Sequence, residues 1–263
     1  MSKLNHTITG NGSTVILIHG LFGNLDNLKA LGTSLIDHTI IRLDVPNHGL
    51  SPHCSNMNYQ SIADAVIQLM DELAIDAAHI VGHSMGGKIA MAVALCYPNR
   101  VKSLIAADIA PVSYSPRHQN VFAALDQLNL TQITGRADAL KQLINSGIDE
   151  ATAQFLLKNL SKTSAGYHWK MNLDGIKQDY DALIGWDITD KQYKGPALCI
   201  RGADSDYVLA AHRQSYLNQF PNVQAKTIAA TGHWLHAQKP AVFNRIVGEF
   251  IAEYDSNLSN LTT

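Results

Sequence analysis

A serine with the spacing of a nucleophile lies in the first third of the chain. Residues 82–86 read G-H-S-M-G, so glycines stand two positions before and two positions after Ser84. An apolar run, 78–81, precedes this motif and a helical pattern, 85–97, follows it. A serine held in a strained strand-to-helix turn needs neighbours without side chains at those two positions. The spacing therefore indicates a serine that attacks a carbonyl carbon.

A nucleophilic serine needs a general base, and His233 is the best placed of the twelve histidines. Residues 232–234 read G-H-W and lie between the last predicted strand, 223–228, and the final predicted helix. In enzymes with this serine turn the histidine comes after the serine and the acid in chain order. His236, three residues later, is interpreted as structural or as a residue at the rim of a pocket.

The acid that would orient this histidine has more than one candidate. In the common pattern it stands in a turn of the form G-x-x-D, but here the turn reads G-A-D-S-D and places Ser205 at that position. Asp204 and Asp206 flank Ser205. Asp108 ends an apolar strand, where the carboxyl ends of parallel strands meet in one crevice, although an aspartate at a strand tip is also a common turn residue. We favour Asp108, keep Asp204 and Asp206 as alternative acids, and regard Ser205 as a candidate helper.

Two backbone amides are candidates for an oxyanion hole, the group of donors that stabilises a developing negative charge. Residues 19–22 read H-G-L-F and follow the apolar run 14–18. One donor is expected from this loop and the other from the residue after the nucleophile, which gives Leu21 and Met85. A plain turn at the end of a strand is the alternative interpretation of the loop.

The order of the elements indicates a parallel α/β sheet, because short apolar runs alternate with helical patterns. The predicted strands are 14–18, 39–43, 78–81, 101–107, 197–201 and 223–228. The predicted helices between and after them are 25–36, 61–73, 85–97, 209–220 and 241–254.

The alternation stops after Asp108 and resumes near residue 191. Between 112 and 190 we find helical stretches at 119–128, 137–143 and 149–160, and an aromatic run at 167–169. We therefore predict a core in two parts, residues 1–111 and 191–255, and a polar tail, 256–263, that frays. The segment 112–190, called the insertion below, is predicted to be a helical lid that follows the strand after the nucleophile helix.

Composition excludes several classes of protein. The chain has 263 residues, of which 46% are hydrophobic and 16% charged, and its net charge is −2. It is too apolar for a disordered chain, and it has no global charge that would attract nucleic acid or anionic lipid. The three cysteines show no C-x-x-C spacing, and the N-terminus lacks an apolar signal segment. We expect a cytoplasmic protein that acts on a small molecule and binds neither nucleic acid nor membrane; the sequence leaves its oligomeric state open.

A metal or nucleotide cofactor is not expected. Several histidines stand near the predicted loops, but they show neither zinc-ligand spacing nor H-E-x-x-H. Neither G-x-G-x-x-G nor a phosphate-binding loop motif occurs. The loop 44–52, which reads D-V-P-N-H-G-L-S-P, carries turn residues, and we predict that it supports the oxyanion loop rather than reacting.

Taken together, these motifs resemble the α/β-hydrolase superfamily over roughly residues 4–254, and within it a group of bacterial esterases and their mitochondrial relatives. The resemblance implies a serine esterase of short-chain acyl esters, with thioesters such as acyl-CoA also plausible. It also implies an acid at Asp108 and a serine at Ser205; the aspartates on both sides of Ser205 depart from the pattern. The segments that carry it are 19–23 with 25–28, 47–53, 82–88, 108–112, and 232–237 with 239–240.

The insertion would supply an apolar pocket, together with residues next to the motifs. For any one of the aromatic residues in the insertion, packing in its own core is the competing interpretation. A thioester of coenzyme A would also need a local basic patch, for which Arg117, Lys158, Lys162 and Lys170 are candidates. The candidate pocket residues are Phe22, Tyr114, Phe122, Phe155, Trp169, Trp186 and Trp234.

Two other functions use the same features. A carbon–carbon bond hydrolase or a lyase of this fold would employ the same three residues. A relative that binds a ligand without turnover is the second alternative, and the presence of Ser84, His233 and a candidate acid argues against it.

Overall fold

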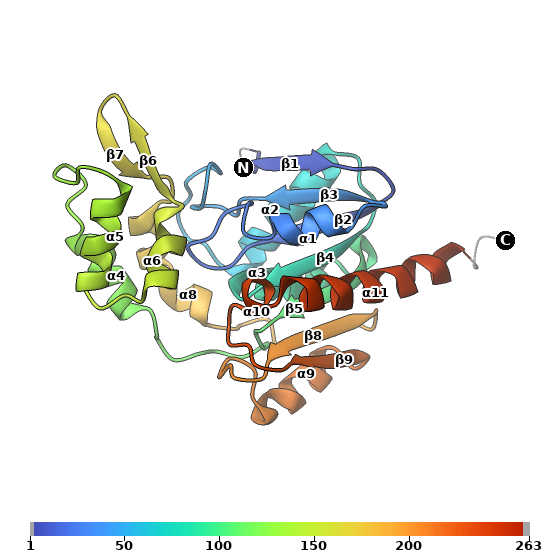
Figure 1. Cartoon of the computed structure of the whole chain (residues 1–263). Coiled ribbons are helices and arrows are strands. Elements are labelled where there is room, and N and C mark those ends of the chain that lie inside the picture. The colour runs from blue at the N-terminus through green and yellow to red at the C-terminus, as the bar shows by residue number, and fades with distance from the viewer. Residues whose placement is uncertain (1–2, 260–263) are drawn as a thin grey trace.

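Seven strands form the central sheet of the computed structural model, which describes residues 3–259, with side chains through residue 255 (Figure 1). Their order is β1-β3-β2-β4-β5-β8-β9. Only β1 runs antiparallel to its neighbour, so the predicted, mostly parallel α/β sheet is confirmed. The strands are β1 (His6–Thr9), β2 (Ser13–Ile18), β3 (His38–Leu43), β4 (Ala78–His83), β5 (Val101–Ala107), β8 (Ala197–Gly202) and β9 (Val223–Ile228).

Both faces of this sheet are covered by helices, which is why its central strands are continuous apolar runs. In β2, Ile16 and Ile18 face one hydrophobic core while Val15 and Leu17 face the other. The first core includes α2 (Tyr59–Glu72), α3 (Met85–Cys96) and α9 (Arg213–Gln219), and the second includes α1 (Lys29–Ser34), α10 (Leu235–Gln238) and α11 (Pro240–Ser259). Two short 3-10 helices also occur outside the insertion: η1 (Pro98–Arg100) follows α3 and η2 (Ala210–His212) precedes α9.

The insertion leaves the sheet after β5 and returns to it before β8, at one side of the molecule (Figure 1). It is mostly helical, and it also contains a hairpin that the prediction of a helical lid did not include. The aromatic run 167–169 belongs to this hairpin, whose turn reaches the left-handed backbone conformation at Gly166. The elements are α4 (Gln119–Gln127), α5 (Arg136–Asn145), α6 (Glu150–Leu157), β6 (Leu160–Thr163), β7 (Gly166–Trp169), α7 (Leu173–Gln178) and α8 (Tyr180–Ile184).

Three predicted helices are shorter than expected; the one predicted over 209–220 is the 3-10 helix η2 followed by α9, which covers only 213–219. The first was expected over 25–36, but only 29–34 is helical. The preceding turn is held in another conformation because the amide of Leu25 donates to Asp44 Oδ1 at 2.7 Å and Asn27 Oδ1 accepts from the amide of Asn24. The helix expected over 149–160 ends at Leu157, where the chain turns into the hairpin.

The two ends of the core also differ from expectation. Strand β1 was not predicted, because a four-residue edge strand that is half-exposed carries little apolar pattern. The frayed tail expected over 256–263 is wrong as far as residue 259, because α11 continues to Ser259. Asp255 accepts hydrogen bonds from His79 and His38, which ties this helix to the sheet. Residues 260–263 of the predicted tail lie outside the described residues.

The turn between β4 and α3 brings two backbones into close contact. A side-chain carbon at Gly82 would lie 2.0 Å from the carbonyl oxygen of Gly86, and one at Gly86 would lie 2.2 Å from that of Ile18. Real carbon atoms cannot approach so closely, so the two glycines of the G-x-S-x-G pattern are sterically required here.

The loop after β3 supports the loop after β2, as predicted. The buried His19 accepts a hydrogen bond at Nε2 from the amide of Val45, at 3.1 Å, so its proton lies on Nδ1 and is donated to the carbonyl of Gly20. His48 packs beside it, with ring centroids 5.3 Å apart. Burial lowers the pKa of His19 to about 4, and burial together with the His19 ring lowers that of His48 to about 3.

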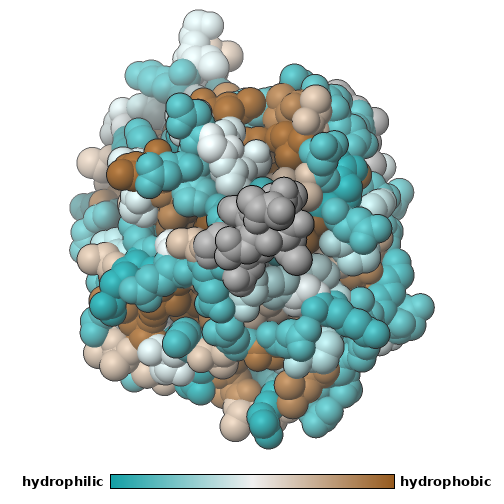
Figure 2. Space-filling model, turned by 90° about the vertical axis from the view of Figure 1, so that its right-hand side faces the viewer, coloured by the Kyte–Doolittle hydropathy of each residue, from teal (hydrophilic) through white to brown (hydrophobic). Residues whose placement is uncertain are grey.

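The face opposite the insertion shows mainly hydrophilic residues around separate hydrophobic ones (Figure 2). Within residues 3–259, no helix is both long and apolar enough to cross a membrane. The same part of the chain contains no group of three His, Cys, Asp or Glu side chains arranged to hold a metal ion.

Gly86→Ala should destabilise the protein by about 1–3 kcal/mol or more, because the added methyl overlaps two carbonyl oxygens. Gly248→Ala is the matched control. It lies inside α11 with its nearest neighbour 3.6 Å away, and it should stabilise the protein by up to about 1 kcal/mol. Urea unfolding midpoints measure both effects, and equal midpoints for the two variants would contradict this steric account.

The free energy of unfolding should fall as the pH drops from 6.5 towards 3. The histidines of the unfolded chain bind protons near pH 6.5, whereas folded His19 and His48 stay neutral to lower pH. Between the two pKa values, each of these histidines lowers the free energy of unfolding by about 1.4 kcal/mol for every pH unit of acidification. His48→Gln should therefore make this decline shallower, and His53→Gln, at an exposed position, should leave it unchanged. Chemical unfolding at a series of pH values measures the slopes; a wild-type slope in His48→Gln would refute the assignment.

Candidate active site

Ser84 stands at the tip of the turn between β4 and α3, next to the carboxyl ends of β2 and β5. Its backbone has φ 54°, a left-handed conformation that residues other than glycine adopt only when their surroundings impose it. The surroundings here are the close contact at Gly82 and Gly86 and the hydrogen bond from the Ser84 amide to the carbonyl of Ala107, 2.9 Å. The strained turn directs the hydroxyl away from the sheet, into a cavity.

His233 joins Ser84 to Asp108. Its Nδ1 lies 2.7 Å from Asp108 Oδ2, and its Nε2 lies 2.9 Å from Ser84 Oγ. Because a carboxylate only accepts hydrogen bonds, Nδ1 carries the proton and Nε2 is free to accept one from the serine. Ser84 directly follows β4, Asp108 directly follows β5 and His233 lies in the loop after β9, so only the folded chain brings the three together.

The buried carboxylate of Asp108 is fully paired. Its Oδ1 accepts from the amide of Gly202 at 3.0 Å, and its Oδ2 accepts from the hydroxyl of Ser205 as well as from His233. Ser205 therefore contacts the acid, as expected for a helper. The alternatives lie elsewhere: Asp204 is exposed, and Asp206 is exposed and pairs with Arg117 at 3.1 Å. Neither alternative is hydrogen-bonded to His233.

Two further residues hold the His233 loop in place. The ring of His83, next to the serine, donates from Nε2 to the carbonyl of His233 at 2.8 Å. The ring of Tyr207 stacks on the His233 ring, with centroids 3.6 Å apart and planes at 14°. Burial, with smaller effects of His236 and His233, keeps the pKa of His83 well below its usual value, so this ring is neutral at pH 7.

Leu21 and Met85, whose amides are the predicted oxyanion donors, line a cavity together with Ser84. Leu21 lies in the loop after β2, which the hydrogen bond between His19 and the Val45 amide holds in place, and Met85 is the first residue of α3. Neither amide donates a hydrogen bond to another residue of the described chain. An oxyanion hole needs such unpaired amide donors close to the reacting serine, so Leu21 and Met85 stay the candidates for it.

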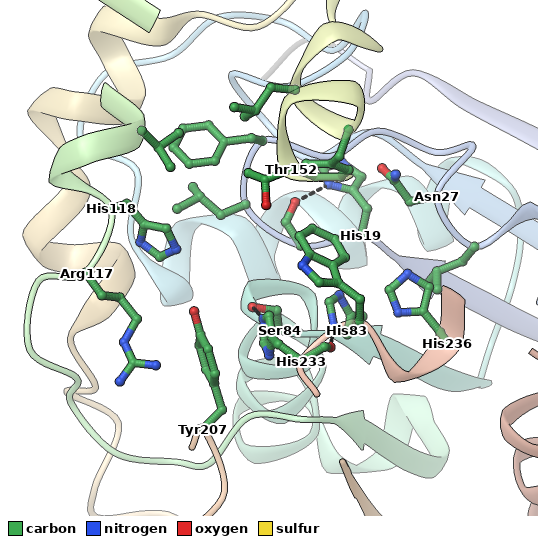
Figure 3. Close-up of a pocket in the computed structure, with 18 residues that line it drawn as sticks. His19, Asn27, His83, Ser84, Arg117, His118, Thr152, Tyr207, His233 and His236 are labelled. Atoms are coloured by element: carbon green, nitrogen blue, oxygen red, sulfur yellow. Dashed lines mark hydrogen bonds between the residues drawn. The ribbon is translucent and has the colours of Figure 1, made fainter. Parts of the chain in front are cut away.

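A cavity of about 280 Å³ opens above Ser84, between the core and the insertion. In Figure 3, Arg117 and Tyr207 lie on one side of Ser84 and His233, and Asn27 and His236 on the other. The size is near the lower end of small-molecule pockets, about 300–1,000 Å³.

Four of the seven predicted pocket residues line a cavity at Ser84. Phe22, Phe155 and Trp234 line the main one, and Tyr114 lines a smaller one beside it. The other three lie outside both linings. Phe122 packs edge-on against Phe22, Trp169 stands in strand β7, and the buried Trp186 donates its ring N–H to Gln219.

Sequence reasoning missed three polar residues of the cavity, namely His118, Thr152 and Tyr207. His118 and Tyr207 line it, and no motif singles them out, although Tyr207 closely follows the turn that carries Ser205. Burial lowers the pKa of His118 and of His236 to about 4, so both are neutral at pH 7. Arg117 is the cavity's cation; its guanidinium carbon lies 4.3 Å from the Tyr207 ring centre.

Comparison with known proteins gives relatives along nearly the whole chain. It is 39% identical over 246 residues to the esterase YbfF of Escherichia coli strain K12, which covers 92% of this chain and 94% of that protein. It is 33% identical over 247 residues to sn-1-specific diacylglycerol lipase ABHD11 of Mus musculus, covering 90% of this chain and 80% of the mouse protein.

Comparison with solved structures also gives an esterase. The solved structure of a marine microorganism esterase superposes with a TM-score of 0.91 at 33% sequence identity, covering 94% of this chain and 99% of that one. A family model for the α/β hydrolase fold matches residues 13–240. This range contains the serine turn, Asp108 and His233, and with this match the chain belongs to the α/β hydrolase family.

Proposed function

We propose that this protein is a serine esterase that hydrolyses carboxylic esters through an acyl-enzyme on Ser84. The observation that carries the proposal is the position of His233, which is hydrogen-bonded to both Ser84 and the buried Asp108 at the floor of a cavity. The printed names of the esterase and lipase relatives support the same class of reaction.

In the acylation step, the Ser84 oxygen attacks the ester carbonyl carbon while His233 Nε2 removes its proton. Asp108 keeps the imidazole in the required tautomer and stabilises its charged form. The amides of Leu21 and Met85 stabilise the oxyanion, and each donor is worth about 10²–10³ in rate. The carbon–oxygen bond to the alcohol then breaks, and His233 returns the proton to the leaving oxygen. Water repeats the sequence to release the acid and restore Ser84.

We assign the role of a lid to residues 112–190, between core parts 1–111 and 191–255. The insertion supplies Arg117, His118 and Phe155 to the cavity wall, which supports this division. The small apolar cavity beside Ser84 favours short-chain acyl esters. Thioesters such as acyl-CoA belong to the same proposal, and of the four basic residues considered for them, Arg117 lines the main cavity and Lys158 lines a neighbouring one.

Ser84→Ala should lower kcat on p-nitrophenyl acetate by about 10⁶-fold, because the attacking oxygen is removed. A fluorophosphonate probe should label the wild type and leave Ser84→Ala unlabelled. Unlabelled wild-type protein would favour the ligand-binding alternative, and full turnover by Ser84→Ala would end the proposal.

Asp108→Asn should lower kcat by about 10⁴-fold, because an amide in place of the carboxylate stabilises the wrong tautomer of His233. Asp204→Asn and Asp206→Asn are matched controls, and both should stay within a few-fold of the wild type, since neither side chain is bonded to His233. Circular dichroism checks that the variants are folded. A mild effect at Asp108 with a large one at either control would reverse the assignment of the acid.

A further inference from the structure

Two cavities meet at Ser84, and they differ in size and lining. The main cavity measures about 280 Å³ and the smaller one about 30 Å³. Ser84 and Leu21 line both, together with Arg117, His118 and Tyr207. An ester bound with its carbonyl at Ser84 therefore has two directions in which its two halves can extend.

The position of His233 decides which half takes which direction. His233, Trp234 and His236 line the main cavity, and none of them lines the smaller one. The leaving oxygen receives its proton from His233 Nε2, so it must lie on the side of the main cavity. The acyl chain is bonded to the same carbonyl carbon and must extend away from the leaving oxygen. That direction leads into the smaller cavity.

The lining of the smaller cavity suits a short hydrocarbon group. Met85 and Ile109 form its wall on the core side, and Leu183 and Ile184 form its wall in the insertion. Its volume of about 30 Å³ is roughly a tenth of that of the main cavity. A short acyl chain suits this space better than a long one, which would have to displace the wall.

Lys88 holds the far wall in place. This lysine of the nucleophile helix is only 1% exposed, and its Nζ donates to the carbonyls of Ile184 and Gly185 at 3.0 and 2.8 Å. The same ammonium lies 4.8 Å from the ring centre of Tyr114, another lining residue. The end of α8 is thereby attached to α3, so the smaller cavity cannot widen without breaking buried hydrogen bonds.

We propose that the smaller cavity is the acyl pocket of the enzyme, and that it selects short acyl chains in esters of larger alcohols or thiols. This proposal rests on the esterase function proposed above. It makes the residues of the smaller cavity, and Leu183 in particular, determinants of acyl-chain length, while the main cavity receives the leaving group.

The test is Leu183→Ala, assayed with p-nitrophenyl esters from acetate to octanoate. The wild type should prefer acetate, and kcat/KM should fall steeply with each added methylene, by a factor of about 10–200 once the pocket is full. The variant should move this fall to longer chains and raise the ratio of butyrate to acetate by about tenfold or more. Ile109→Ala enlarges the same cavity from the core side and serves as the second variant if Leu183→Ala does not fold.

Phe155→Ala is the matched control, because Phe155 lines the main cavity and not the smaller one. It should keep the butyrate-to-acetate ratio of the wild type and change the relative rates on acetate esters of small and large alcohols. A chain-length profile that shifts in Phe155→Ala and stays fixed in both pocket variants would overturn the proposal and place the acyl chain in the main cavity. Absence of any ester hydrolysis by the wild type, with Ser84 unlabelled, would instead overturn the proposed function.

Discussion

The buried carboxylate of Asp108 is the interaction on which the site depends. It accepts hydrogen bonds from the Gly202 amide, the Ser205 hydroxyl and His233. These three donors lie at the end of β8, in the turn after it and in the loop after β9, so one side chain connects three separate segments to the end of β5. An uncompensated buried charge is costly, and each donor reduces that cost. The geometry at His233 is therefore maintained by the stability of the core itself.

The strained turn at Ser84 is the second constraint, and it works through backbone rather than charge. Gly82 and Gly86 permit β4 and α3 to approach within a distance that no side chain would allow. The same contact places the Met85 amide beside the serine, and the His19–Val45 hydrogen bond holds the loop that carries Leu21. Ser84 and the loop of Leu21, which the proposed mechanism uses as nucleophile and oxyanion donor, are thus held by contacts within the core, whereas the insertion completes the cavity above them.

Both cavities at Ser84 are lined by residues of the core and of the insertion. Residues of the core position the reacting atoms, and residues of the insertion close the space around them. Lys88 connects the two, because it belongs to the nucleophile helix and holds the end of α8. Where a substrate can extend therefore depends on how the insertion is seated on the core.

The sequence by itself determined the sheet, the serine turn and the histidine, because continuous apolar strands and sterically required glycines leave direct marks in the order of residues. It also singled out Asp108 while keeping Asp204 and Asp206 open, since strand ends can be located but not the directions of loop side chains. Only the tertiary structure decided that Asp206 faces Arg117, that Tyr207 stacks on His233 and that Trp186 packs away from the cavities. These outcomes depend on contacts between segments about 30 to 90 residues apart, and local patterns carry no information about such contacts.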